Sequence, residues 1–343
     1  MAGTRDVRLE ERPDPTILAP GDVIVRVVAA CVCGSDLWGY RDFGGGRPRL
    51  MGHEMVGVIE QIGDAVATLS VGDFVIAPFS LSDGTCQSCR AGSTSVCDHG
   101  AFFGTRDEDR HPIDGAQGEL IRMPLGESSL VVVPGPVDDA LVPHLLALSD
   151  VASTGHHAAV SAGVGPGDVV VVVGDGAVGL SAVLAASRLG AKRIIAMSRH
   201  ADRQAVAREF GATDIIEERG EDAIAALRKL LDGDLADAAL ECVGTAEAME
   251  QTIGSVRGGG RVGFVGVPGD RIDLDINRLF RGNITIGGGM APARTYIPEL
   301  LAAVLDGSMQ PGKVFDLELP LAEVAEAYAA MDERRAIKVL LRP

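Results

Sequence analysis

The chain has 343 residues, more than one hydrophobic core usually serves, so we expect two domains. Its 48 acidic and 31 basic side chains give a net charge of −17, which repels polyanions and argues against a nucleic-acid partner. No apolar run approaches the roughly 20 residues that cross a bilayer, so no membrane partner is expected and a small molecule is the expected ligand.

The first residues, 1–11, are polar and lead directly into a strand-like pattern. No charged and then apolar segment with a small-residue cleavage site opens the chain, so export is not expected and the protein is predicted to be cytoplasmic. In such a chain, clustered cysteines are predicted to be reduced thiols or metal ligands instead of disulfides. The six cysteines are Cys31, Cys33, Cys86, Cys89, Cys97 and Cys242.

Residues 22–79 have the composition of a β-rich core with many turns. Apolar runs at 23–28 and 55–62 are separated from their surroundings by Gly21, Gly63 and the pair at 72–73, Gly-Asp. Short apolar runs bounded by glycine and aspartate indicate strands joined by turns. This part of the chain is therefore predicted to fold as a β domain.

A cysteine and a histidine within this β-rich part indicate an open metal site. Cys33 stands in Cys-Gly-Ser-Asp and His53 in Gly-His-Glu, which supplies a thiolate, an imidazole and, in Glu54, an alternate or outer carboxylate. The predicted third ligand is Asp150, and three protein ligands leave one zinc position vacant for substrate. Taken singly, a buried cysteine or histidine is more often packing and Asp150 could cap a helix. Their order in the chain favours the metal site.

Ser35 lies two residues after Cys33, so its hydroxyl is a candidate proton carrier at this site. Zinc would lower the pKa of an alcohol hydroxyl to near neutrality, and hydride would then leave the alcohol carbon for a nicotinamide ring. This chemistry requires no other nucleophile. We therefore predict that Ser35 passes on the proton of the alcohol.

Residues 80–118 lack periodicity and form too long a segment for an idle loop in a compact domain. Within them, four potential ligands follow the spacing Asp83-x2-Cys86-x2-Cys89-x7-Cys97. Four protein ligands leave no vacant position, which is typical of a structural zinc. A carboxylate oxygen is an acceptable ligand, but three thiolates and one carboxylate are predicted to bind zinc more weakly than four thiolates.

From about residue 146, apolar runs alternate with helical patterns, as in a parallel doubly wound sheet. The predicted elements are strands at 169–173, 193–197, 238–242, 261–267 and 284–287 and helices at 178–189 and 201–210. The chain then ends with an amphipathic helix and a strand at 338–341. The predicted apolar face of that helix holds Leu321, Val324, Ala325, Tyr328 and Met331.

A glycine-rich turn follows the first of these strands. Gly174, Gly176 and Gly179 form G-x-G-x-x-G between a run of five valines and a predicted helix, the context that a dinucleotide-binding turn requires. The three glycines serve the tight turn, the close approach of the pyrophosphate and the packing of helix on strand, and the helix N-terminus attracts phosphate. A purely structural turn is the alternative.

The end of the second strand distinguishes NAD from NADP. An NAD enzyme places an acidic side chain there, about 20 residues past the glycines, to accept from the ribose hydroxyls. The chain instead has Ser198, Arg199 and, shortly after, Arg203. A serine hydroxyl and arginines suit a 2′-phosphate, so NADP is predicted. Alternatively, the arginines form a solvated surface cluster and NAD is also used.

With these motifs the chain resembles the zinc-dependent medium-chain alcohol dehydrogenases over nearly its whole length. In its Cys/His/Asp ligand set it is similar to the bacterial NADP-dependent secondary alcohol dehydrogenases. The resemblance implies an α/β plus β fold and a homo-oligomer, either a dimer or a tetramer. The implied parts are a GroES-like catalytic domain at 1–146 with a zinc lobe at 80–100, a Rossmann domain at 147–287 and a C-terminal return to the catalytic domain at 288–343.

The resemblance also implies further site residues. Trp38 stands where many family members have a histidine that completes the proton relay, and indole cannot accept a proton. Ser35 would then pass the proton through the cofactor ribose, water or Glu54. Phe79 resembles a position that lines the substrate pocket, as Trp38 would, although both aromatics could instead belong to the core. The cofactor-binding residues that the resemblance adds are Thr154, Ala177 and Val178.

The predicted function is reversible hydride transfer between a primary or secondary alcohol and NADP, giving an aldehyde or ketone, with one catalytic and one structural zinc. Polyol or sugar, threonine and formaldehyde dehydrogenases that use NAD share most of these motifs and are alternatives. A zinc-free quinone or enoyl reductase would lack Cys33, His53 and the cysteine lobe. A catalytically idle binding or structural member would have lost the ligands, which this chain retains.

Overall fold

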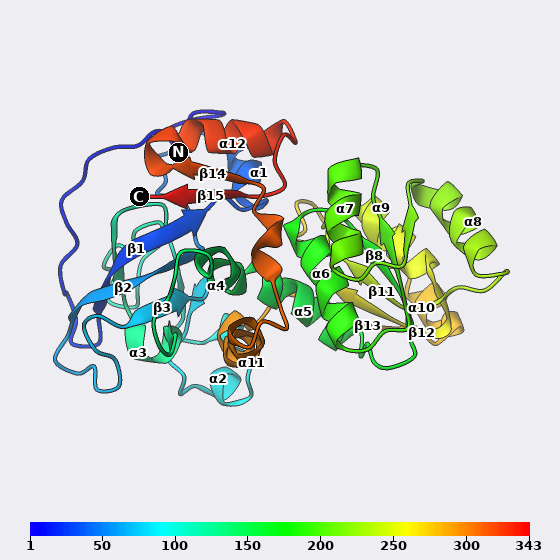
Figure 1. The fold of residues 1–343 in the computed structure, drawn as a ribbon, viewed down its shortest axis with the longest axis horizontal. Helices are drawn as coiled ribbons and strands as arrows, with labels where there is room; N and C mark the ends of the chain where they lie inside the picture. Colours follow the sequence, from blue (N-terminus) through cyan, green and yellow to red (C-terminus); the bar gives the residue numbers. More distant parts are fainter. The chain divides into compact units, whose positions relative to one another are not determined.

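The computed structural model describes residues 1–343 and divides them into two compact units (Figure 1). Unit 1 comprises Met1–Asp150 together with Pro292–Pro343, and unit 2 comprises Val151–Ala291. The chain therefore leaves the first unit once, builds the second and returns. No helix in either unit combines the length and the apolar character needed to cross a bilayer.

Unit 1 is built on a seven-stranded sheet in the order β14-β15-β1-β2-β3-β7, with β6 also pairing with β1. The long central strand β1 is apolar except for Arg26, and both of its faces are largely buried. Its strands are β1 (Val23–Cys31), β2 (Met55–Ile62), β3 (Phe74–Ala77), β6 (Leu120–Met123), β7 (Val131–Val132), β14 (Leu317–Pro320) and β15 (Val339–Arg342).

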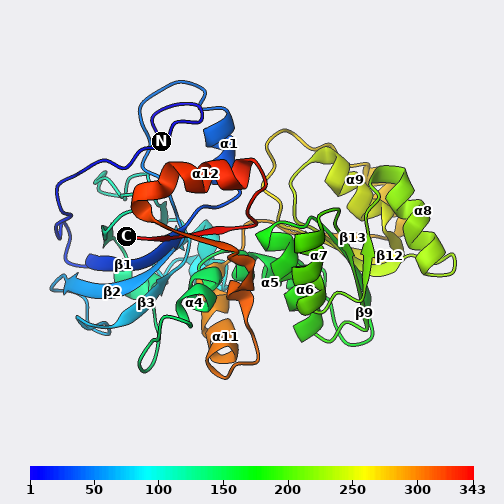
Figure 2. The ribbon, with the colours of Figure 1, turned by 45° about the horizontal axis from the view of Figure 1, so that its top comes forward.

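The C-terminal segment completes this sheet. Strand β15 pairs antiparallel with the end of β1, where Cys31 lies opposite Leu340, and Figure 1 shows the red strand beside the blue one. Helix α12 (Val324–Asp332) lies along β15 in Figure 2 and buries Tyr328 completely. Residues more than 300 positions apart in the chain thus share one core.

Residues 80–118, for which no periodicity was expected, form only short elements. Strands β4 (Ser80–Leu81) and β5 (Ala101–Phe102) pair with each other. The remaining elements of unit 1 are α1 (Asp36–Arg41), α2 (Gln87–Arg90), η1 (Thr94–Val96), α3 (Gly126–Ser129), α4 (Val142–Leu148), α11 (Ala293–Leu305), η2 (Pro311–Val314) and η3 (Leu321–Glu323). The short elements between β4 and β5 position the cysteine lobe.

Unit 2 contains a six-stranded parallel sheet in the order β10-β9-β8-β11-β12-β13. Its strands are β8 (Val169–Val173), β9 (Arg193–Met197), β10 (Asp214–Ile216), β11 (Ala236–Glu241), β12 (Val256–Phe264) and β13 (Thr285–Gly288). Its helices are α5 (Val151–Ser161), α6 (Ala177–Arg188), α7 (Ala201–Glu209), α8 (Gly220–Leu230), α9 (Ala246–Gly254) and α10 (Ile276–Gly282). The predicted fold class, a β-rich part plus a parallel doubly wound sheet, is confirmed.

Helices cover the sheet of unit 2 on both faces, which explains why its central strand is purely apolar. Helix α6 packs on β8 and β9 and helix α9 packs on β8 and β11, so the valines of β8 have no exposed face. The strand order turns back beside β8, because β9 follows it on one side and β11 on the other. In such a sheet, ligands bind beyond the carboxyl ends of the strands at this turning point.

Candidate active site

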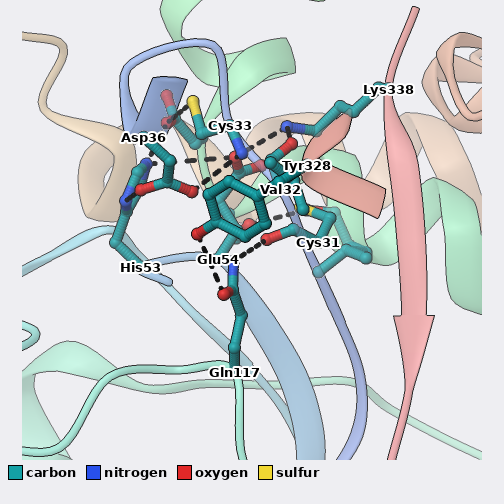
Figure 3. Close-up of polar contacts among 12 residues, drawn as sticks. Cys31, Val32, Cys33, Asp36, His53, Glu54, Gln117, Tyr328 and Lys338 are labelled. Atoms are coloured by element: carbon teal, nitrogen blue, oxygen red, sulfur yellow. Dashed lines mark hydrogen bonds and ion pairs between the residues drawn. The ribbon is translucent and has the colours of Figure 1, made fainter. Parts of the chain in front are cut away.

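Four side chains of unit 1 converge on one point in the way that a metal ion requires. Cys33, His53, Glu54 and Asp150 each offer a ligand atom, and these atoms all lie within 4.8 Å of one another. Asp150 Oδ2 lies 3.3 Å from His53 Nε2 and 3.7 Å from Cys33 Sγ. Figure 3 shows Cys33, His53 and Glu54 turned toward a shared space. The structure thus brings together the four residues predicted for the open metal site.

The local backbone explains how these side chains meet. Cys33 follows the end of β1, and its N–H donates to Asp36 Oδ2 at 3.0 Å, which fixes the turn into α1. His53 precedes β2, the antiparallel neighbour of β1. Gly52 before it has a φ of +90°, and a Cβ there would collide with Gln117. Pairing of β1 with β2 therefore sets the spacing of the thiol and the imidazole.

Asp36 orients the imidazole of His53. Asp36 Oδ1 lies 3.5 Å from His53 Nδ1, while His53 Nε2 faces Asp150. A carboxylate on one ring nitrogen fixes the ring and leaves the other nitrogen for a metal. Burial alone would lower the pKa of His53, but the charges of Asp36 and Cys33 raise it well above its ordinary value. The cluster therefore favours a positive charge at its centre.

The donor set fits zinc. A thiolate, an imidazole and carboxylate oxygens are zinc ligands, and the cluster contains more acidic groups than its one imidazole can neutralise. Burial raises the pKa of the Cys33 thiol, with the Glu54 charge as a further cause, so its thiolate needs a cation. Glu54 Oε2 is buried without a hydrogen-bond partner. A divalent cation would satisfy both groups.

Lys338 holds the other oxygen of Glu54. Its Nζ donates to Glu54 Oε1 at 2.7 Å and to the carbonyl of Val32 at 3.2 Å, and both charged side chains are only 1% exposed (Figure 3). Burial raises the pKa of Glu54 while the charge of Lys338 opposes that rise. The residue directly before the C-terminal strand β15 is thus bonded to the metal cluster through a buried ion pair.

A second contact from the C-terminal segment supports the end of β1. Tyr328 on α12 donates its hydroxyl to Gln117 Oε1 at 3.0 Å, and Gln117 Nε2 donates to the carbonyl of Cys31 at 3.0 Å (Figure 3). Gln117 also packs on Gly52, next to His53. One amide side chain therefore contacts both segments that carry the cysteine and histidine.

The second predicted ligand group also forms a compact cluster. Ligand atoms of Asp83, Cys86, Cys89 and Cys97 lie within 4.8 Å of one another, and the sulfurs of Cys86 and Cys97 are 3.9 Å apart. Asp83 Oδ1 accepts from the N–H groups of Cys86, at 3.0 Å, and of Thr85. These bonds lower the pKa of Asp83, so this carboxylate stays charged. Three sulfurs and one carboxylate fit a structural zinc.

In unit 2, the glycine turn joins β8 to α6. Gly174 has a φ of +117°, and a Cβ on Gly179 would lie 2.0 Å from the carbonyl oxygen of Gly174, so the helix can approach the turn only with glycine there. A Cβ on Gly176 would meet nothing, which leaves that face of the turn open. A cradle of backbone beside a helix N-terminus fits a pyrophosphate.

The side chains after β9 contact this turn. Ser198 Oγ donates to Asp175 Oδ2 at 2.8 Å, and Arg203 Nη1 lies 3.2 Å from Asp175 Oδ1. Arg199 is exposed. Two of the three predicted phosphate-binding residues are therefore bonded to a carboxylate within the turn itself.

Comparison with known proteins decides the family. Residues 19–135 match the model for the alcohol dehydrogenase GroES-like domain, and residues 177–306 match the model for zinc-binding dehydrogenases. Zinc-type alcohol dehydrogenase B of Aspergillus flavus is 30% identical over 98% of this chain and 78% of its own. This chain belongs to the zinc-dependent medium-chain alcohol dehydrogenases. The predicted resemblance is confirmed.

Other members of the family match this chain over its whole length. Sorbitol dehydrogenase of Bacillus subtilis is 30% identical over 100% of this chain and 96% of its own. The structure of alcohol dehydrogenase TADH from Thermus sp. ATN1 has a TM-score of 0.90 and 31% identity, and covers 100% of this chain and 98% of that one. As a zinc-dependent alcohol dehydrogenase, the protein is an oxidoreductase that uses zinc and a nicotinamide cofactor.

The remaining predicted residues of this dehydrogenase lie as follows. Ser35 is exposed at the start of α1. Trp38 is 39% exposed, and Phe79 is half-buried. Thr154 is buried within α5. Ala177 and Val178 form the first turn of α6 directly after the glycines.

Sequence reasoning missed several polar residues around the sites of the dehydrogenase. A lysine directly before the apolar C-terminal strand was an available signal, because lysine is almost never buried without a partner. An aspartate between two glycines of the cofactor turn was another. The second missed aspartate ends the Cys-Gly-Ser-Asp motif but received no role, and the glutamine carried no signal in the sequence. The missed residues are Lys338, Asp175, Gln117 and Asp36.

Proposed function

We propose that the protein catalyses reversible hydride transfer between a primary or secondary alcohol and NADP, giving an aldehyde or ketone. The observation that carries this proposal is the convergence of a thiol, an imidazole and two carboxyls within 4.8 Å in unit 1. In unit 2, a glycine turn with an open face supports the dinucleotide part of the proposal.

Cys33, His53 and Asp150 hold the catalytic zinc in this proposal, with Glu54 as an alternate ligand. Zinc bound there supplies a Lewis acid that polarises the alcohol oxygen and lowers its pKa. Asp36 fixes the imidazole ring, as the 3.5 Å contact with Nδ1 indicates. Burial of the cluster keeps bulk water away from these charges, since Cys33 is 7% exposed.

Ser35 carries the proton in this proposal. It is exposed two residues after Cys33, so its hydroxyl can exchange protons with water without a second titratable side chain. Trp38 lies in the first turn of α1 and offers no acceptor. Trp38 and Phe79 are proposed to line the alcohol site, because both leave part of their surface exposed.

We also propose that NADP is preferred over NAD. Ser198, Arg199 and Arg203 follow the strand end where an NAD enzyme carries an acid, and no carboxylate stands among residues 196–200. Hydroxyl and guanidinium groups are suited to a phosphate. The further proposals are a second, structural zinc at the Asp83 lobe and a homo-oligomeric assembly.

Steady-state kinetics with metal analysis tests the function. Short secondary alcohols, primary alcohols, sorbitol, threonine and formaldehyde are each assayed with NADP and NAD. We expect turnover of simple alcohols with a lower Michaelis constant for NADP, and two zinc ions per chain. A protein that turns over only polyols with NAD, or none of these substrates, would contradict the proposal.

Metal removal tests the role of the cluster. Chelation is expected to abolish turnover, and added zinc to restore it. Cys33→Ala should abolish turnover and leave NADPH affinity unchanged, because the dinucleotide turn lies in the other unit. Val71→Ala is the control: Val71 is 61% exposed in unit 1, it belongs to neither ligand cluster, and its variant should keep full activity. Turnover retained by Cys33→Ala would remove zinc from the mechanism.

A further inference from the structure

Asp175 lies within the glycine turn, between Gly174 and Gly176, and is held in place from two sides. Its Oδ2 accepts from Ser198 Oγ at 2.8 Å, and its Oδ1 lies 3.2 Å from Arg203 Nη1. Arg203 Nη1 also donates to the backbone carbonyl of Asp175 at 3.4 Å. The side chains of Asp175 and Arg203 are only 14% and 12% exposed. This carboxylate is therefore preorganised.

The bond to Ser198 locates the carboxylate of Asp175 in the sheet. Ser198 is the first residue after β9, the second strand of the dinucleotide-binding sheet. Adenosine ribose hydroxyls are recognised at the end of this strand, usually by an acid that the strand itself supplies. Here the strand end has no acid, and Asp175 reaches the same place from the glycine turn.

Asp175 also affects how well Arg199 and Arg203 can bind a phosphate. An arginine already paired with a carboxylate offers less charge to a phosphate, so Arg203 is a weaker phosphate ligand than its position alone indicates. Arg199 is exposed next to Ser198 and is the better-placed cation for a phosphate. The site thus contains an acid, Asp175, that suits the ribose hydroxyl of NAD, and a free cation, Arg199, that suits the 2′-phosphate of NADP.

We propose that Asp175 determines cofactor selectivity: its carboxylate accepts from the ribose 2′-hydroxyl of NAD and opposes the 2′-phosphate of NADP. This inference rests on the proposed dinucleotide function. It implies that the preference for NADP is smaller than Ser198 and the two arginines alone would give. At a partly exposed site, removing one like charge beside a phosphate is worth about tenfold in affinity.

Binding titrations of NADPH and NADH to the whole protein test this proposal, followed by the fluorescence of the reduced nicotinamide. Asp175→Asn keeps the size of the side chain and an acceptor for Ser198 but removes the charge. Its dissociation constant for NADPH should fall about tenfold while that for NADH stays equal or rises. Competition by 2′,5′-ADP, which lacks nicotinamide, should strengthen by the same factor.

Asp214→Asn is the matched control. Asp214 also pairs with an arginine, Arg193, at 2.8 Å, but at the amino ends of β9 and β10, away from the turn. Its variant should leave both dissociation constants unchanged. Should Asp175→Asn fail to fold, Asp175→Ser removes the same charge and is expected to shift the ratio in the same direction.

Two outcomes would overturn the inference. Equal changes in both dissociation constants would show that Asp175 only supports the turn, and no change in either would show that its charge lies away from the ribose. The wild-type ratio tests the proposed function separately. Wild type that binds NADH more tightly would refute the NADP preference, while a shifted ratio in Asp175→Asn would still support the role of Asp175.

Discussion

Lys338 and Glu54 form a charged pair with almost no access to water. Each side chain is 1% exposed, and their atoms are 2.7 Å apart. Moving a single charge out of water costs several kcal/mol, so each of these residues is tolerated only because the other is present. The carbonyl of Val32 gives Lys338 a second acceptor. The pair links the last strand of the chain to the segment that carries the metal ligands.

Replacing Lys338 by methionine is expected to destabilise unit 1 by about 3 kcal/mol, because the charge of Glu54 would remain buried without a partner. The double variant Lys338→Met with Glu54→Gln should recover most of this loss. Urea denaturation followed by fluorescence measures both. Trp38 is the only tryptophan and lies in α1, so its signal reports unit 1. Additive losses in the double variant would contradict the coupling of the two residues.

At the scale of elements, the sequence predicts strands and helices where the pattern is uniform. The run of valines at β8 and the apolar run of β9 have the predicted bounds. Strand β12 begins at Val256, five residues before the predicted start, because three consecutive glycines interrupt its apolar pattern. Strand β10 has only three residues and was not predicted, since so short a run gives no periodicity.

In the candidate site, too, some residues were predictable from the sequence and others were not. Zinc ligands were predictable because cysteine, histidine and acidic residues at these spacings have few other common uses. Lys338 contacts Glu54 only once β15 has paired with β1, and Gln117 contacts Cys31 and Tyr328 across long distances in the chain, which no local sequence pattern predicts. Asp175 was hidden because the fingerprint leaves its position unspecified. Tertiary pairing, not local sequence, decides these contacts.

Helix α4, which leads to Asp150, is attached to η2 of the C-terminal segment by His144. His144 Nδ1 accepts from the N–H of Gly312 at 2.9 Å, so this bond requires the neutral imidazole. Burial, and then the charge of Lys313, lower the pKa of His144 below the ordinary value of 6.5. In the unfolded chain the residue protonates near its ordinary pKa. The unfolded state therefore binds more protons than the native state below pH 6.5.

This difference predicts a loss of stability in weak acid. Between the ordinary pKa and the lowered native pKa, the free energy of unfolding of unit 1 should fall as the pH falls, and it should be unaffected by His144 above that range. His144→Asn retains an acceptor for Gly312 but does not titrate. Urea denaturation at pH 7.5 and at about pH 5 should show a smaller acid loss in the variant. Equal losses in both proteins would exclude this role for His144.

At the scale of the whole molecule, the chain order makes the metal-bearing unit dependent on both ends of the sequence. β1 pairs with β15 through Cys31 and Leu340, so the unit that carries the ligands is complete only with the C-terminal segment. Unit 2 is continuous and closes on itself. Such long-range pairing slows folding, because the loop must close before the contacts form. The continuous unit is therefore expected to form first.

Unit 2 also has an unprotected edge. Strand β13 pairs only with β12, and its other edge has no partner strand. Large apolar side chains are exposed on the helix just before it, where Phe280 is 85% and Ile276 is 66% exposed. Natural proteins usually blunt a free edge with charges or cover it. An open edge beside exposed apolar residues is the expected surface for a second copy of the chain.

If the proposed homo-oligomer forms through this edge, Phe280→Asp should shift the protein from the assembled state toward the monomer, because two buried carboxylates would face each other across a symmetric contact. Light scattering after size exclusion measures the mass of each form. Val71→Asp is the control: Val71 is 61% exposed in unit 1, and its variant should keep the assembled mass. Dissociation by both changes would indicate a general effect of added charge, and unchanged mass for Phe280→Asp would place the contact elsewhere. We expect the contact between two copies to include strand β13 itself and not only the apolar side chains of α10. The backbone N–H and C=O groups of β13 can pair with those of an identical strand without any change in fold.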